Sequence, residues 1–435
     1  MSDVQIGFAG IAILLSLIAL RVPIGVSLIG VSFAGIWMLV GERAAWGAIG
    51  IIPYSFTATW QLSSVPMFLL MGFLCFHAGL TKGLFDAARV WLSGLPGGLA
   101  IATVFGAAGF AAVTGSSVAC AAAMGRIAVP EMVRRGYDTS LATGTVAAAG
   151  TIGALIPPSI LMIIYGIIAE VPINQLFLGG IGAGLLTGVG YILVITIRVM
   201  LNPALAPRVM ERVPLVERFQ ALQATWPVIL LVFGVFGGLF SGVFTPTEAG
   251  AVGAFLAMAI ATLKRTLTWE KLKNSLLETL LTSASLFIIA IGASMLTRFL
   301  AFSGAGDFLA EMVIALGANE LMLLLGISLV YLVLGMFLEP MGAMLLTLPI
   351  LLPIIDSANF SLVWFGVLLT KFLEIGMITP PIGLNVFVIK GVVGDLASTS
   401  TIFRGIMWFL FADLIVVALL VAFPEISLYL PSLLD

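Results

Sequence analysis

Long apolar segments separated by short polar ones run through this chain from end to end. A helix needs roughly 20 apolar residues to cross the hydrocarbon core of a membrane, which is about 30 Å thick. Apolar runs cover 4–20, 23–40, 62–80, 140–169, 175–200, 226–240, 248–263, 276–300, 362–390 and 402–430. Two further pairs of runs, 99–113 with 118–133 and 321–338 with 344–355, are each divided by a short segment of small or polar residues. The pattern predicts an all-α polytopic membrane protein.

The composition agrees with a membrane protein and excludes a water-soluble globule. Of the 435 residues, 9% are charged and 61% are hydrophobic, against about 25% and about 45–50% in soluble domains. The mean hydropathy is +1.21. No basic block points to nucleic acid. A single histidine and two cysteines inside apolar runs argue against a transition-metal site and a disulfide framework.

Basic residues in the connections predict the orientation of the helices, because Lys and Arg are enriched on the cytoplasmic side. Two connections, two spans apart, carry Arg198, Arg208, Arg212 and Arg218, and Lys264, Arg265, Lys271 and Lys273. Counting spans from them places further basic residues on the same side: Arg21, Lys82, Arg89, Arg134, Arg135, Lys390 and Arg404. All these basic residues fall on one side only if each divided pair is a re-entrant hairpin, which enters and leaves the membrane by the same face. Hairpin 1 (98–133) then opens to the cytoplasm, and hairpin 2 (320–355) opens to the opposite side.

The second half of the chain repeats the first at an offset of 223 residues. The matching positions are Pro130 with Pro353, Gly153 with Gly376, Pro157-Pro158 with Pro380-Pro381, and Leu161 with Leu384. The span count makes the two halves inverted. Two successive prolines break a helix, and the carbonyls that they free need a protected cavity. Inverted repeats with broken helices and a midplane site are typical of secondary transporters.

In the first half, the hairpin tip and the helix break are candidate binding elements. The tip, Thr114-Gly115-Ser116-Ser117, offers hydroxyl and carbonyl oxygens within apolar sequence; the alternative is a tight turn that serves packing alone. The break at 150–159 offers the hydroxyls of Thr151 and Ser159, and its alternative is a proline kink needed only for packing. Oxygens of this kind suit a hard cation, and a half-helix N-terminus suits an anion.

In the second half, the corresponding tip is 338–343 and the break is 376–385. Glu339 is an acid within an apolar stretch, where a charge is costly. It either ligates a cation or caps a helix end. Thr379 and Asn385 are candidate oxygen donors at the break.

Other polar residues lie within apolar runs, and two interpretations are open for most of them. Lys371 and Glu374 lie three residues apart and either pair with each other or place Lys371 near a substrate carboxylate. Arg126 either has a role at hairpin 1 or extends to the interface, and His77 is expected to pack within its helix. The amphipathic stretches 82–93 and 306–316 precede the hairpins, and we expect them to lie along the membrane interface as connecting arms.

Together these features resemble the large membrane subunit of tripartite ATP-independent periplasmic (TRAP) transporters. The resemblance covers essentially the whole chain and rests on four motifs: the Gly-Ser-Ser tip, Leu155-Ile156-Pro157-Pro158-Ser159, Ile378-Thr379-Pro380-Pro381-Ile382-Gly383-Leu384, and Thr245-Pro246-Thr247-Glu248-Ala249. It implies import of an organic acid, driven by Na⁺ as the coupling ion and without an organic cofactor, across the bacterial inner membrane. The implied partners are a periplasmic substrate-binding protein and a small four-helix membrane subunit on a separate chain.

The resemblance also implies an elevator-type transporter, in which a transport domain slides against a scaffold. The transport domain would comprise 62–169 and 276–390, and the scaffold 1–61, 170–275 and 391–435. The sodium sites implied at the tips and breaks comprise Gly115, Ser116, Ser117, Thr151, Gly153 and Pro157 in one half and Glu339, Gly342, Gly376, Thr379 and Pro380 in the other. Substrate would lie between the tips, near Thr114, Ser117, Ser159, Pro340 and Asn385.

Three other functions compete with this interpretation. A stand-alone sodium-coupled dicarboxylate carrier or exchanger of related fold would need no binding protein. A channel would need a continuous polar stripe, whereas the polar clusters here lie only at the breaks. An intramembrane enzyme would need a catalytic constellation such as paired aspartates within spans, and Asp413 stands alone in its helix.

Overall fold

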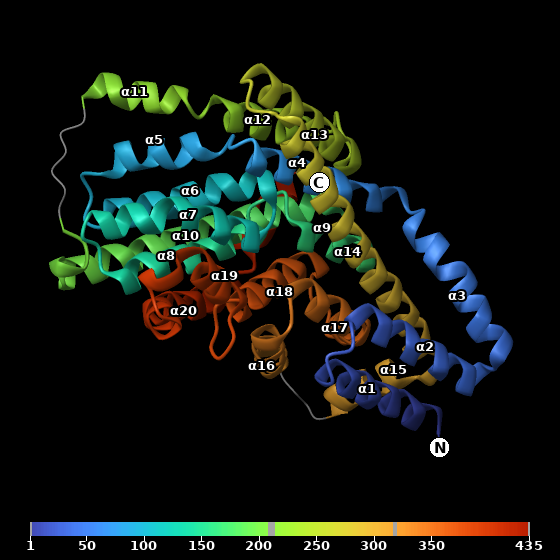
Figure 1. The fold of residues 1–435 in the computed structure, drawn as a ribbon. Coiled ribbons are helices and arrows are strands. Elements are labelled where there is room, and N and C mark those ends of the chain that lie inside the picture. Colours follow the sequence, from blue (N-terminus) through green and yellow to red (C-terminus); the bar gives the residue numbers. More distant parts are fainter. Residues whose placement is uncertain (1, 208–213, 316–319, 434–435) are drawn as a thin grey trace.

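The computed structural model describes residues 2–207, 214–315 and 320–433 (Figure 1). Within these ranges every regular element is a helix, which confirms the all-α prediction. Seven of the described helices are long and apolar enough to cross a membrane. Large apolar side chains such as Phe233, Leu329 and Phe411 lie exposed on the outside of the helices. Exposed apolar surface on this scale requires lipid or partner proteins around it, so the chain is a multi-pass membrane protein.

Three N-terminal helices pack around one long helix from the middle of the chain. Helices α1 (Asp3–Ala19) and α2 (Ile24–Val40) match the first two predicted runs, and α3 (Glu42–Thr57) follows them. All three pack against α14 (Trp269–Ser303), whose Phe299 ring fills the space beside glycines of α1 and α2. Figure 1 shows this group at the end of the molecule that carries the N-terminus.

The first half forms the helices that the pattern predicts. A turn separates the two helices of hairpin 1, and the Pro-Pro segment separates the two parts of the broken helix. The helices are α4 (Ser64–His77), α5 (Lys82–Leu92), α6 (Gly98–Thr114), α7 (Ser117–Arg134), α8 (Thr139–Thr151) and α9 (Ile160–Ile168). The predicted bounds of hairpin 1 therefore agree with those of α6 and α7. Its re-entrant insertion stays a prediction.

The second half contains the corresponding helices after a middle section. The middle section comprises α10 (Ile173–Leu201), α11 (Leu215–Gln223), α12 (Trp226–Phe240), α13 (Pro246–Leu263) and α14. The second half comprises α15 (Ala305–Ala315), α16 (Glu320–Phe337), α17 (Pro340–Ser357), α18 (Leu362–Gly376) and α19 (Leu384–Val393), followed by α20 (Thr399–Ala422) and α21 (Glu425–Leu428). Both Pro-Pro peptide bonds are cis.

Two helices lie in segments where the pattern predicts none. Helix α3 exposes apolar side chains and includes Pro53, and α11 lies in a connection that the sequence marks as a polar loop. Both are amphipathic or short, so a search for continuous apolar runs overlooks them. Arg208 and Arg212, which help to predict the orientation, and residue 316 of the second predicted arm lie outside the described residues.

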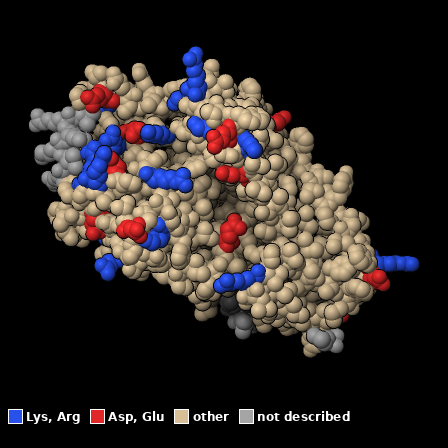
Figure 2. Space-filling model, viewed as in Figure 1, with Lys and Arg blue, Asp and Glu red and all other residues tan. Residues whose placement is uncertain are grey.

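The two halves meet in the middle of the molecule. Helices α6, α7, α8 and α10 run side by side (Figure 1). Both α7 and α8 pack against α19 of the second half, and α8 also packs against α20. Gly144 of α8 contacts Gly405 of α20 through the backbone. Near the C-terminal end of α5, the indole N–H of Trp91 donates to the carbonyl oxygen of Arg218 in α11 at 3.1 Å. Figure 2 shows basic side chains gathered at the end of the molecule that carries α5 and α11.

Candidate functional site

The tip of hairpin 1 lies directly against the break of the first half. Gly115, between α6 and α7, has a φ of 61°, which lies in the left-handed region that favours glycine. A Cβ on Gly115 would collide with the carbonyl oxygen of Pro158, and a Cβ on Gly153 would lie 3.0 Å from the backbone nitrogen of Ser117. Glycine at both positions therefore lets the two backbones touch.

Two serines cap the helices that begin at this contact. The hydroxyl oxygen of Ser116 accepts from the N–H of Ala119 at 3.4 Å at the start of α7. Ser159 accepts in the same way from the N–H of Met162 at 3.3 Å at the start of α9. Helix N-termini carry partial positive charge. The contact between tip and break thus brings two such ends close together.

In the second half, Glu339 occupies the N-cap position of α17. Its side chain makes no capping hydrogen bond, so the structure does not support the interpretation of this acid as a helix cap. The carboxylate instead contributes to the wall of a cavity. Cation ligation by Glu339 stays a prediction.

The break of the second half is more open than that of the first. Gly376, at the end of α18, lies so close to α16 that a Cβ would come within 2.6 Å of the Cα of Gly335. Beyond it, the hydroxyl of Thr379 donates to the carbonyl oxygen of Ile375 at 2.7 Å. Residues 381 and 382 are exposed, whereas the corresponding residues 158 and 159 are buried.

A cavity of about 440 Å³ lies between the two tips. The structure brings six of the predicted site residues together in its wall: Thr114, Gly115, Ser116, Ser117, Glu339 and Pro340. The two breaks also contribute to the wall, through Ile160 at the start of α9 and Met377 after α18. Residues of α4 and α14 complete it. A hollow with acidic side chains beside it is visible near the middle of the face drawn in Figure 2.

The wall of the cavity combines acidic side chains with helix N-termini. Glu278, Glu339 and Glu374 line it, and no Lys or Arg does so among the described residues. The first residues of α7, α9 and α17 also line it. The wall therefore offers carboxylates for cations and positive helix ends for an anion.

The other predicted site residues lie outside this wall: Thr151, Gly153, Pro157, Ser159, Gly342, Gly376, Thr379, Pro380 and Asn385. Gly342 lies against Ile24 of α2. The amide nitrogen of Asn385 donates to the carbonyl oxygen of Ala147 in α8 at 3.4 Å, so this residue joins the two broken helices. Roles in binding for these nine residues stay predictions.

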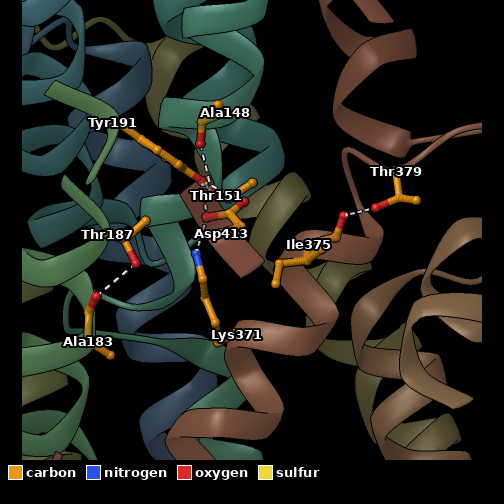
Figure 3. A network of polar contacts seen from close by, with 9 residues as sticks. All are labelled: Ala148, Thr151, Ala183, Thr187, Tyr191, Lys371, Ile375, Thr379 and Asp413. Carbon is orange, nitrogen blue, oxygen red and sulfur yellow. Dashed lines mark hydrogen bonds and ion pairs between the residues drawn. The ribbon is translucent and has the colours of Figure 1, made fainter. Parts of the chain in front are cut away.

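A buried polar network crosses the middle of the molecule next to the cavity (Figure 3). The ammonium of Lys371 on α18 lies 2.5 Å from the carboxylate of Asp413 on α20. The phenol of Tyr191 on α10 donates to the same carboxylate at 2.9 Å, and its oxygen lies 3.0 Å from the hydroxyl of Thr151 at the end of α8. All four side chains are fully buried. The network joins both broken helices to α10 and α20.

This network gives Lys371 a partner that neither interpretation named. The side chain pairs with Asp413, so the predicted pair with Glu374 is wrong. His77 does more than pack, because its Nε2 lies 3.2 Å from a carboxylate oxygen of Glu278 on α14. Arg126 is exposed on α7, in agreement with a side chain that extends to an interface.

Sequence reasoning missed Tyr191, Asp413, Glu278 and Glu374 as parts of the site. One signal was available for Asp413, since an acid within an apolar helix needs a partner. That partner lies on a different helix. No local pattern connects the two positions.

The family of the chain follows from comparison with known proteins. The profile of the family described as "Tripartite ATP-independent periplasmic transporter, DctM component" matches residues 11–426. The chain belongs to this family, and similar proteins are named as large permease proteins of TRAP transporters.

Similar proteins include permeases named for different substrates. The C4-dicarboxylate TRAP transporter large permease protein DctM of Pseudomonas aeruginosa is 38% identical, over 86% of each chain. The sialic acid TRAP transporter large permease protein SiaM of Vibrio cholerae is 32% identical, over 96% of this chain and 97% of its own. The isethionate TRAP transporter permease protein DctMQ of Oleidesulfovibrio alaskensis is 32% identical, over 87% of this chain and 60% of its own.

Solved structures share the fold at low sequence identity. The YdaH transporter of Alcanivorax borkumensis has a TM-score of 0.62 at 15% identity, over 89% of this chain and 91% of its own. MtrF of Neisseria gonorrhoeae has a TM-score of 0.57 at 14% identity, over 96% of this chain and 95% of its own. These similarities establish the fold alone.

Proposed function

We propose that the chain imports an organic anion together with sodium ions, as the large permease of a TRAP transporter in the bacterial inner membrane. The observation that carries the proposal is the cavity lined by both hairpin tips. The substrates named for the relatives, C4-dicarboxylates, sialic acid and isethionate, are all organic anions. We therefore place an organic anion in this cavity.

The charges of the wall support coupling between the anion and a cation. Three acids line the cavity, and no basic side chain balances them among its described lining residues. An anion that entered this wall alone would meet net negative charge. Bound cations would remove that repulsion, and helix N-termini would then attract the anion. The oxygens of hydroxyls and carboxylates suit a hard monovalent cation such as Na⁺.

We propose an elevator mechanism with the partners that the family name implies. The transport domain would comprise 62–169 and 276–390, and the remaining helices would form the scaffold. A domain that moved with only part of its ligands would carry unbalanced charge into the barrier, which is costly. A periplasmic binding protein would deliver the anion, and a small membrane subunit would complete the complex. The fusion name DctMQ of one relative supports such a subunit.

Uptake into liposomes tests this function. The chain and its small subunit are reconstituted, and an inward sodium gradient is imposed with and without the cognate binding protein. Succinate, N-acetylneuraminate and isethionate serve as first probes. Uptake that needs both the gradient and the binding protein is the expected result. Sodium-driven uptake without the binding protein would instead identify a stand-alone carrier.

A further inference from the structure

Glu374 is a buried carboxylate that the polar network of Figure 3 leaves out. It lies near the end of α18, is 1% exposed, and lines the cavity between the tips. Its Oε2 atom has no hydrogen-bond partner among the described residues. A buried carboxylate stays ionised only when it is paired or bound to a cation, and otherwise takes up a proton.

No side chain nearby supplies that positive charge. Lys371, one helical turn earlier, contacts Asp413 instead. With both carboxylates ionised, the one cation and two carboxylates of this buried group leave one negative charge in excess. Glu278 and Glu339 line the same cavity but are at least partly exposed, and Glu278 lies beside His77.

The tip of hairpin 1 faces Glu374 with an unused hydroxyl. Ser117 is 5% exposed and lines the same cavity. Neither Ser117 Oγ nor Glu374 Oε2 has a partner with hydrogen-bond geometry among the described residues. Two unsatisfied oxygens, one on α7 and one on α18, thus belong to residues that line the same cavity.

A purely structural explanation would have Glu374 stabilised by the N-terminus of α7. That end carries about half an elementary charge, which cannot balance a full one. It also leaves the hydroxyl of Ser117 without a partner. A bound cation would satisfy both groups at once.

We propose that Glu374 and Ser117 ligate one sodium ion, with Glu374 as its charged ligand, so that this site draws on both halves of the chain. The inference rests on the proposed sodium coupling. It adds an acid of the second half to the site expected at the tip of hairpin 1. Sodium binding would then tie hairpin 1 to α18.

Sodium binding to the purified full-length chain tests this site without transport. The thermal unfolding midpoint is titrated with NaCl, against KCl at equal ionic strength, for wild type, Glu374→Gln, Ser117→Ala and the double variant. Glu217→Gln on exposed α11 is the matched control, since it removes the same charge outside the cavity. We expect Glu374→Gln to raise the sodium concentration for the half-maximal shift by about tenfold or more, because ligand charge sets cation affinity, and Glu217→Gln to leave it unchanged.

The double variant tests whether the two residues share one ion. Residues that ligate the same ion are coupled, so the double variant should lose little more affinity than Glu374→Gln alone. Additive losses would contradict a shared ion. If Glu374→Gln does not fold, Glu374→Asp is used instead, because it keeps the charge and shortens the side chain. We expect the sodium affinity of Glu374→Asp to lie between that of the wild type and that of Ser117→Ala/Glu374→Asp. An unchanged affinity would overturn the inference.

The result also separates this inference from the proposed function. A wild-type protein that responds equally to NaCl and KCl would refute the sodium coupling itself. A sodium response that is retained in full by Glu374→Gln would refute only the assignment of Glu374.

Discussion

The two halves contain the same parts but differ in how tightly tip and break fit together. In the first half, Gly115 lies against Pro158, and residues 157–159 are buried. In the second half, Thr379 and Pro380 are half-buried, and residues 381 and 382 are exposed. α6 is mostly buried, whereas α16 exposes most of its surface and packs mainly on α18. In this structure the first half is closed around its break and the second half is open.

This difference indicates where each half can change. A tip that lies against its break through backbone atoms has little room to move without losing the contact. An exposed break leaves room for another segment to pack over it. We therefore expect the second half to move when ligands bind, and the first half to supply a fixed wall.

The largest expected effect concerns the network that joins the halves. Asp413→Asn removes the carboxylate that Lys371 contacts, which should lower the free energy of unfolding by about 3–5 kcal/mol. The thermal unfolding midpoint in detergent measures it. The control Lys371→Met/Asp413→Leu removes both charges and should recover much of the loss. An unchanged midpoint for Asp413→Asn would show that the halves are held together by other contacts.

A smaller effect is expected from glycines in the two halves. Gly115→Ala places a Cβ at positive φ and against the carbonyl of Pro158, so it should cost more than the about 1–2 kcal/mol of the left-handed conformation alone. Gly383→Ala in the second half also has positive φ, but its nearest neighbour would be 3.2 Å from the new Cβ. Gly79→Ala, with open space around it, reports the backbone cost. Equal losses in unfolding free energy for all three variants would contradict the tighter fit of the first half.

Chemical labelling compares the two breaks directly. Ile382→Cys is exposed and Ser159→Cys is buried, so the former should react with a maleimide at least about tenfold faster, since a buried thiol reacts only after local opening. The native cysteines, Cys75 and Cys120, are both buried and give a low background in the wild type. Equal rates would mean that the two breaks are equally open in solution.

The smallest expected effects come from single hydroxyls. Ser116→Ala and Thr379→Ala should each raise the sodium concentration for half-maximal uptake severalfold while changing expression less. Ser116 also loses its helix cap, worth about 1 kcal/mol, whereas Thr379 donates only to the carbonyl oxygen of Ile375 at the end of α18. Uptake with unchanged sodium dependence in both variants would remove these residues from the sodium sites.

The sequence locates the interruptions between helices well because each is marked locally. Small polar residues interrupt apolar runs at 114–117, and the double prolines interrupt two helices. Helices α3 and α11 lack such a signal, since neither is a long apolar run.

The partners of the buried polar residues are harder to predict because their contacts join distant parts of the chain. Lys371 lies three residues from Glu374 on the same helix, which favours a local pair. In the fold, Lys371 lies closer to Asp413, and Glu374 is left at the cavity. The packing of four helices decides between these partners, and no spacing in the sequence records it.

Protection of the cavity from labelling tests the central claim, that ligands bind between the two hairpin tips. Ala122 lines the cavity on α7 and is partly exposed, so Ala122→Cys places a thiol in its wall. Its maleimide labelling rate is measured in proteoliposomes with NaCl, with KCl, and with NaCl plus the anion that supports uptake. We predict slower labelling with sodium than with potassium, and the slowest with sodium and anion together. The same rate in all three conditions would place the binding site elsewhere.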